Sequence, residues 1–123
     1  MTNKVYKYLE PIGVPLDHNF RPDMDCNHTM VMSYHFFGEG GLQFGDGIVT
    51  EYGGSLQVDL FVKHRVDFSH AKKQIKEVLT KNGFILMDIT TTGENVDGVG
   101  KVDHIKFTFN YIELEEHSNE QKH

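Results

Sequence analysis

Apolar and polar residues alternate most clearly between residues 55 and 64, in the stretch SLQVDLFVKH. One side of an extended chain here would be apolar: Leu56, Val58, Leu60 and Val62. Residues 102–114 repeat the pattern, and their apolar face is Ile105, Phe107, Phe109 and Tyr111. Strands with a single apolar face are typical of a sheet that is covered on one side only.

Three further strands are predicted from shorter patterns. Residues 30–37, MVMSYHFF, place apolar side chains at every even position, and residues 48–52, IVTEY, are β-branched and aromatic. Residues 84–92 are also rich in β-branched residues, and the turn residues of 93–100 imply a hairpin with the last strand. The glycines of 37–47 and the Gly53-Gly54 pair are expected to interrupt the strands, and the Pro- and Asp-rich residues 15–27 to form an irregular connection.

Two helices are predicted. Residues 1–10 place Val5, Tyr6 and Leu9 on one face ahead of Pro11. The stronger signal covers about 68–82, whose apolar residues Ala71, Ile75, Val78 and Leu79 have helical spacing. Asp67 or Ser69 is expected to cap its start, and Gly83 to take the left-handed position after its end.

Together these elements predict an α+β fold. We expect a mostly antiparallel sheet of four to five strands, with the short N-terminal helix and the main helix packed on one face. The length of 123 residues is that of one domain, so residues 1–114 are assigned to it and the polar residues 115–123 to a C-terminal tail.

The glycine-rich stretch FGEGGLQFGDG, residues 37–47, could suggest a phosphate-binding loop. Such loops lead into a helix and present amides and a basic residue to the anion. This one leads into a predicted strand, and it contains Glu39 and Asp46 but no Lys or Arg. We therefore interpret it as a hairpin connection, on which apolar Leu42 and Phe44 either fold back or contact a partner.

Charge and composition narrow the function classes. The formal charge is −6, which disfavours a protein that grips nucleic acid. The single cysteine cannot form an internal disulfide and fits a reducing compartment, and no stretch is apolar over the length of a membrane span. We expect assembly in a cytoplasm and no membrane partner.

Candidate chemistry is sparse. His18, Cys26 and His28 lie near three aspartates and could bind a metal ion, but their spacing matches no closed zinc motif. A catalytic group of Asp59, His64, Asp103 and His104 would require one particular strand register, which the sequence does not define. No nucleophile motif is present. We expect no enzyme activity, no cofactor and no metal.

The order of the segments resembles that of tail terminator, or tail completion, proteins of long-tailed bacteriophages. The resemblance runs from about Tyr6 to Leu114 and rests on five segments: IGVPL, MVMSYHFF, FGDG, SLQVDLFVKHRVDFSHAKKQIKEVLTKNGF and IKFTFNYIEL. It implies a structural virion protein of the tail and neck that forms a hexameric ring on the tail tube. The chain departs from the family pattern in its His- and Asp-rich residues 16–29 and in its glycines at 38–47.

The resemblance also implies the partners. These are further copies of the chain, the major tail tube protein and a head-tail connector protein, and DNA would pass through the lumen without specific binding. Six copies would carry six times the formal charge of −6, so an acidic lumen would not retain DNA. The alternatives are a head-closure component of the neck, a small homo-oligomeric binding module unrelated to phages, and a metal-dependent enzyme using His18, Cys26 and His28.

The predicted contact residues lie around the glycine stretch and on one strand: Leu42, Phe44, Asp46, Ile48, Tyr52 and Phe61. Apolar residues also interrupt the otherwise polar strand faces at Val31, Phe37, Phe61 and Ile112. Two interpretations of these four residues remain open: they form a contact surface for a partner, or the N-terminal helix packs over them.

Overall fold

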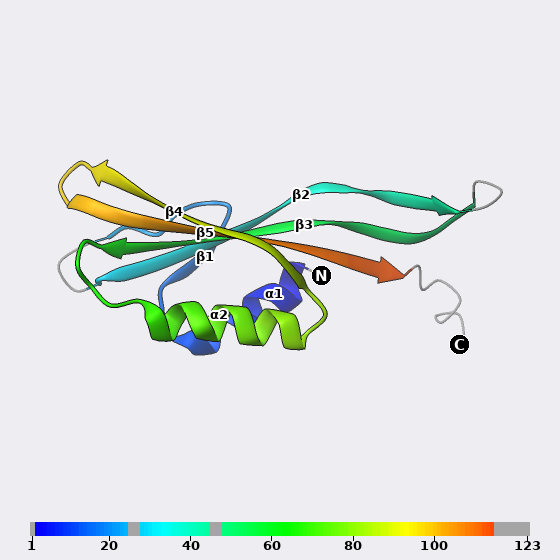
Figure 1. Cartoon of the computed structure of the whole chain (residues 1–123), viewed down its shortest axis with the longest axis horizontal. Coiled ribbons are helices and arrows are strands. Elements are labelled where there is room, and N and C mark those ends of the chain that lie inside the picture. Colours follow the sequence, from blue (N-terminus) through cyan, green and yellow to red (C-terminus); the bar gives the residue numbers. More distant parts are fainter. Residues whose placement is uncertain (1, 25–27, 45–47, 115–123) are drawn as a thin grey trace.

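A computed structural model describes residues 2–24, 28–44 and 48–114; for residues 2–3, 39–44, 48–52 and 113–114 it describes the backbone alone. The chain forms one sheet with its helices on one face (Figure 1). The elements follow in the order α1 (Thr2–Leu9), the 3-10 turn η1 (Glu10–Ile12), β1 (Leu16–His18), β2 (Met30–Phe44), β3 (Ile48–Lys63), α2 (Ser69–Lys81), β4 (Ile85–Val96) and β5 (Gly100–Leu114).

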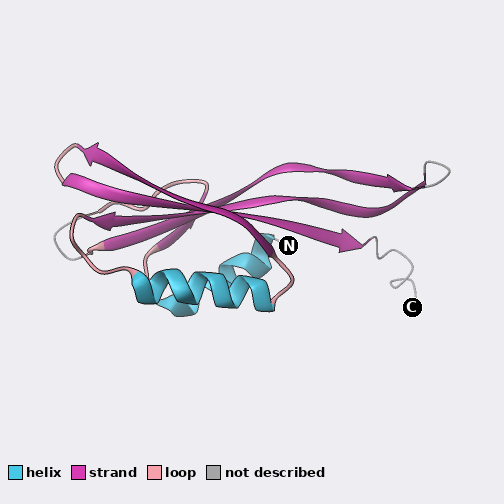
Figure 2. Cartoon of the chain, viewed as in Figure 1, coloured by secondary structure: helices cyan, strands magenta, loops and turns pink. Residues whose placement is uncertain are grey.

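The sheet has five strands in the order β1-β2-β3-β5-β4. β1 runs parallel to β2, and the other three neighbouring pairs are antiparallel. Figure 2 shows the helices on one side of the strands, which leaves the opposite side of the sheet, here called the open face, without a helix. The predicted fold class, an α+β domain with a mostly antiparallel sheet and a short and a main helix, is confirmed.

The core lies between the sheet and the two helices. The alternating residues predicted for β3 and β5 point into it, and Leu56, Phe107 and Phe109 are fully buried there. α1 contributes Val5 and Leu9, both fully buried, whereas Tyr6 is 41% exposed and not part of the buried face that was expected to contain it. α2 contributes Ala71, Ile75 and Leu79.

The ends of α2 follow from local chemistry. The Ser69 amide donates to Asp67 Oδ1 at 2.9 Å, and this hydrogen bond lowers the pKa of the Asp67 carboxyl. At the other end Gly83 has a φ of +95°, and the Phe84 amide donates to the Leu79 carbonyl at 3.0 Å. This is a Schellman ending, and both Phe84 and Leu79 belong to the buried core. The predicted helix and the left-handed Gly83 are confirmed; Phe68 occupies the N-cap position, and Asp67, one residue before it, accepts the first helical amide.

The prediction that glycines interrupt the strands is wrong. β2 continues through Gly40 and Gly41 to Phe44, and β3 runs unbroken through Gly53 and Gly54. The pairing Gly40↔Gly53 follows a register shift after Phe37, where Gly38 has a φ of +65°. A Cβ atom at position 53 would lie 2.7 Å from the Tyr111 carbonyl oxygen, so glycine lets β3 and β5 approach there.

The prediction of no regular element in residues 15–27 is also wrong, because Leu16–His18 form β1. These three residues pair with Met32–Tyr34, and the Met32 amide donates to the Pro15 carbonyl at 2.8 Å. Such a strand is stabilised by a partner distant in sequence, and its three residues carry no periodic pattern of their own. In the described part of the chain, neither helix has the length and apolar character needed to cross a membrane.

Candidate functional site

The open face of the sheet divides into two parts. In the first part Val31, Phe61 and Val102 form a small apolar cluster with Met24, and Arg21 lies over the Phe61 ring at 5.4 Å. Residues 19–24 thus cover this part, and Phe61 is only 9% exposed. The second layer expected over these residues exists, but it comes from the segment after β1, because α1 lies on the other face of the sheet.

A cluster of polar side chains lies beside this covered part. His104 on β5 has its Nε2 atom 2.7 Å from Asp59 Oδ1 and its Nδ1 atom 2.7 Å from Glu94 Oε2. Gln57 Nε2 donates to the same Asp59 oxygen at 2.9 Å, and His35 Nδ1 lies 3.9 Å from Asp59 Oδ2. The cluster therefore links all four of the long strands, and its Asp59 side chain is 8% exposed.

The contacts of His104 favour one charge state of its ring. A neutral imidazole has one N–H group, so it could donate to only one of the two carboxylates. The protonated ring donates to both. The hydrogen bond to Asp59 raises the pKa of His104 above the ordinary value of 6.5, the Glu94 contact and both negative charges act in the same direction, and partial burial opposes them. The two carboxylates, on β3 and β4, thus favour the imidazolium form of His104.

This arrangement predicts a pH dependence of stability. Because the folded state holds the His104 proton more tightly than the unfolded state, the stabilisation is complete below a pH of about 6.5 and is lost as the pH rises through the raised pKa. One proton limits the slope to about 1.4 kcal/mol per pH unit. We expect urea unfolding between pH 6 and 9 to show this loss in the wild type and not in His104→Gln.

The exposed His70 on α2 supplies a control for this measurement. His70→Gln should retain the wild-type pH dependence, since His70 lies outside the cluster. If the wild type and His104→Gln lose stability in parallel above pH 6.5, the imidazolium between two carboxylates is not the cause.

The candidate catalytic group does come together in the structure, but as two separate pairs. Its members are Asp59, His64, Asp103 and His104. Asp59 contacts His104, and His64 Nδ1 lies 3.9 Å from Asp103 Oδ1. Each ring nitrogen of His104 contacts a carboxylate. The ring would therefore have to break its contact with one carboxylate before it could exchange a proton with a substrate. In this structure the cluster joins strands.

The second part of the open face carries exposed apolar side chains. Phe37 is 41% exposed, Ile112 55% and Ile85 58%. The register Phe37↔Ser55↔Asn110↔Ile85 places two of them in one row across the sheet, and Ile112 pairs with Gly53 in the next row. The four face-interrupting residues therefore separate: Val31 and Phe61 are covered by the chain itself, and Phe37 and Ile112 are not.

Beyond this part, β2 and β3 continue as a hairpin, here called the arm, made of residues 38–44 and 48–54 (Figure 1). Leu42, Phe44, Ile48 and Tyr52, four of the six predicted contact residues, lie on its strands, and their side chains are outside the described part of the structure. Asp46 lies outside the described residues altogether. Their role in contacts stays a prediction, as does that of the largely covered Phe61.

The structure places two of the three candidate metal ligands. His18 lies on β1 and stacks on the Tyr34 ring with 4.8 Å between ring centroids, and His28 is exposed. Cys26 lies outside the described residues. Within residues 2–24, 28–44 and 48–114, no group of three or more His, Cys, Asp or Glu side chains is arranged to hold a metal ion.

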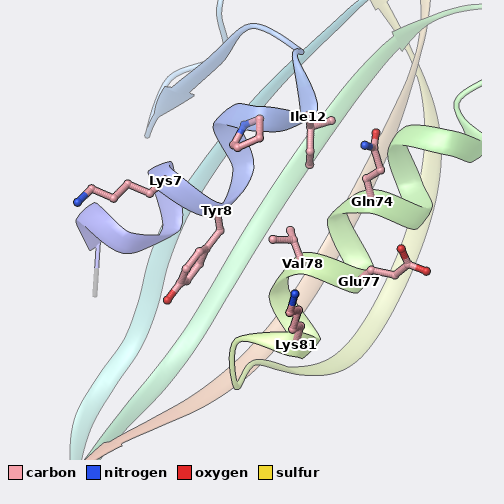
Figure 3. A pocket seen from close by; sticks show the side chains of 8 residues that line it. Lys7, Tyr8, Ile12, Gln74, Glu77, Val78 and Lys81 are labelled. Carbon is pink, nitrogen blue, oxygen red and sulfur yellow. The ribbon is translucent and has the colours of Figure 1, made fainter.

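A groove between the helices was not anticipated from the sequence. It has a volume of about 420 Å³ and is lined by Lys7, Tyr8, Pro11, Ile12, Gln74, Glu77, Val78 and Lys81. Tyr8, Ile12 and Val78 point into it from η1 and both helices (Figure 3). One feature of the sequence could have drawn attention to this region. The predicted helices are rich in lysine, although the formal charge of the chain is −6.

Comparison with known proteins supports the fold and does not identify the function. No family model matches the chain, and no curated protein matches it. Solved structures do match. One of them, a protein whose designation gives no function, covers 92% of this chain and 89% of its own, with a TM-score of 0.52 and 10% sequence identity. At that identity the likeness shows a shared fold alone.

Proposed function

We propose that this chain is a structural virion protein that forms a ring on the end of a bacteriophage tail tube. The ring ends tail growth and offers the surface to which the head connector binds. The order of the sequence segments, from IGVPL to IKFTFNYIEL, supports the proposal through its resemblance to tail terminator proteins. The arm is the observation that carries the proposal further.

In the described residues, the end of the arm is a two-stranded ribbon. Glu51 is the last residue of β3, toward the arm tip, that pairs with β5, opposite Leu114. Closer to the tip, Gln43 and Phe44 pair only with Val49 and Ile48 in the described ladders. A two-stranded ribbon is marginally stable in water by itself. A contact with another chain would stabilise it, and a ring provides one such contact for every subunit.

The exposed apolar residues near the base of the arm support an assembly surface in the same region. Phe37, Ile85 and Ile112 lie on the open face where the strands lead into the arm. Individual exposed apolar residues are common, but a group of neighbouring ones at the base of a projecting hairpin is typical of a surface that becomes buried in a complex. The apolar composition of the arm, with Leu42, Phe44 and Ile48, extends this character.

The proposal predicts that Phe44→Asp yields a folded monomer that cannot terminate tail tubes. A charge placed in a contact that excludes water weakens it by several kcal/mol, which leaves no measurable ring. Native mass spectrometry in the presence of tail tubes would report the six-fold species, and electron microscopy would report tube length. We expect tubes with the variant to grow beyond the wild-type length.

Phe20→Asp is the matched control, since Phe20 is 72% exposed and is not a residue of the arm. It should form rings and terminate tubes as the wild type does. Rings and tube lengths equal to wild type with Phe44→Asp would remove the arm from the assembly. A wild-type chain that leaves tubes uncapped at every concentration would refute the proposed function itself.

A further inference from the structure

The charges of the chain are segregated between its layers. α1, η1 and α2 contain six of the twelve basic residues and two of the eighteen acidic residues, a formal charge of +4. The remainder of the chain therefore carries −10, because the total is −6. A basic helix layer on an acidic protein attracts an acidic partner surface.

The groove between α1 and α2 is the place in this layer where a partner could insert side chains. Its floor contains Tyr8, Ile12 and Val78, which are half-buried and packed against the core. Three charged residues line it, Lys7 on α1 and Glu77 and Lys81 on α2 (Figure 3). With two lysines against one glutamate the lining is net basic, and a net basic lining above an apolar floor fits a segment that is both apolar and acidic.

The arm has that composition. Residues 38–44 and 48–54 contain Glu39 and Glu51 and no Lys or Arg. Their apolar residues are Leu42, Phe44, Ile48, Val49 and Tyr52. The arm therefore complements the groove in both charge and apolar character.

The arm that docks in a groove must belong to a different molecule. The arm extends along the strands beyond the end of α2 and away from the helices (Figure 1). The groove lies between the helices, on the face of the sheet body. Two different surfaces of one chain, joined head to tail, generate a closed ring when the rotation between subunits closes.

We propose that the arm of one subunit docks in the groove between α1 and α2 of the next subunit. This inference rests on the proposed function, since it names the contact by which the ring closes. The partner is a second copy of the chain, and Glu39 and Glu51 of its arm face the lysines of the groove.

Charge reversal tests the docking in the full-length chain. The groove variant combines Lys7→Glu with Lys81→Glu, and the arm variant combines Glu39→Lys with Glu51→Lys. Each variant alone sets like charges against one another. We expect each to raise the chain concentration at which half of the material is in rings by about 100-fold, because like charges in a contact cost several kcal/mol.

Mixing the two variants should restore the ring. The acidic arm of the groove variant then meets the basic groove of the arm variant, and the basic arm meets the acidic groove. Native mass spectrometry of the mixture should show rings that contain both variants in equal numbers, which also demonstrates that both chains fold. Arg65→Glu combined with Lys101→Glu, the same charge change at exposed residues outside the groove, should form rings as the wild type does.

The outcomes separate this inference from the proposed function. Wild-type rings that form equally well with the groove variant would overturn the docking and leave the ring in place. A groove variant that fails alone and is not rescued by the arm variant would overturn it too, since the groove would then take another occupant. A wild-type chain that forms no ring on tail tubes would overturn both.

Discussion

Replacing Phe107 with alanine is expected to lower the free energy of unfolding by about 3–5 kcal/mol. The Phe107 side chain is fully buried at the centre of the core, and its ring stacks beside that of Phe109 with 6.4 Å between centroids. Truncation removes the ring from an apolar environment and leaves a cavity that the rigid sheet cannot close. A loss of this size is a large share of the 5–15 kcal/mol typical of a folded domain.

Urea denaturation of the isolated chain measures this loss. Ile112→Ala, on the same strand but at a side chain that is 55% exposed, is the control and should change stability by about 0.5 kcal/mol or less. If Phe107→Ala and Ile112→Ala lower the free energy of unfolding by the same amount, the helices do not cover the face of β5 that the structure assigns to the core.

Asp59→Ala is the second substitution with a large expected effect, a loss of about 3 kcal/mol. The Asp59 carboxylate is nearly buried and accepts hydrogen bonds from His104 and Gln57. Its removal leaves the imidazolium without its more deeply buried partner, and unpairing a buried charge costs more than the pair contributes while intact. His104 is 15% exposed, so some hydration limits the loss.

Asp59→Asn separates the charge from the shape. The asparagine oxygen can still accept a hydrogen bond from His104, so thermal unfolding should show a smaller loss than for alanine. Without the negative charge the pKa of His104 is no longer raised as far, and the pH dependence above 6.5 should weaken. If Asp59→Ala and Asp59→Asn lower the stability equally, the shape of this side chain and the hydrogen bond that asparagine keeps do not contribute.

The parts of the fold that the sequence predicts are those with local causes. The alternation of 55–64 and 102–114 comes from one buried face, and the positions expected to be apolar are the buried ones. The helix predicted at about 68–82 carries its own end signals, since Asp67 accepts the Ser69 amide at its start and Gly83 takes the left-handed conformation after its end. Such signals need no knowledge of the partner element.

The parts that the sequence did not predict depend on distant partners. β1 exists because Leu16–His18 pair with β2, and β3 continues through Gly53 because β5 lies beside it. The Asp59–His104–Glu94 cluster requires the register of three strands, and a shift by one residue would turn His104 to the core. Arg21 and Met24 cover Phe61 through tertiary contacts that no periodic pattern indicates.

The residues that carry the proposed assembly were only partly accessible to sequence reasoning. Leu42 and Phe44 stood out as apolar residues among glycines. The groove did not, because Lys7 and Lys81 lie 74 positions apart and become neighbours of one hollow only when α1 packs beside α2.

The short strand β1 gives the beginning of the chain a double role. Before it, Val5 and Leu9 pack beneath the sheet with α2; after it, Arg21 and Met24 pack on the opposite side over Phe61. The first 24 residues thus pass around the edge of the sheet at β1 and contact both of its faces. A single cut that releases them would bare both surfaces at once, so the amino terminus is a poor place to shorten this protein.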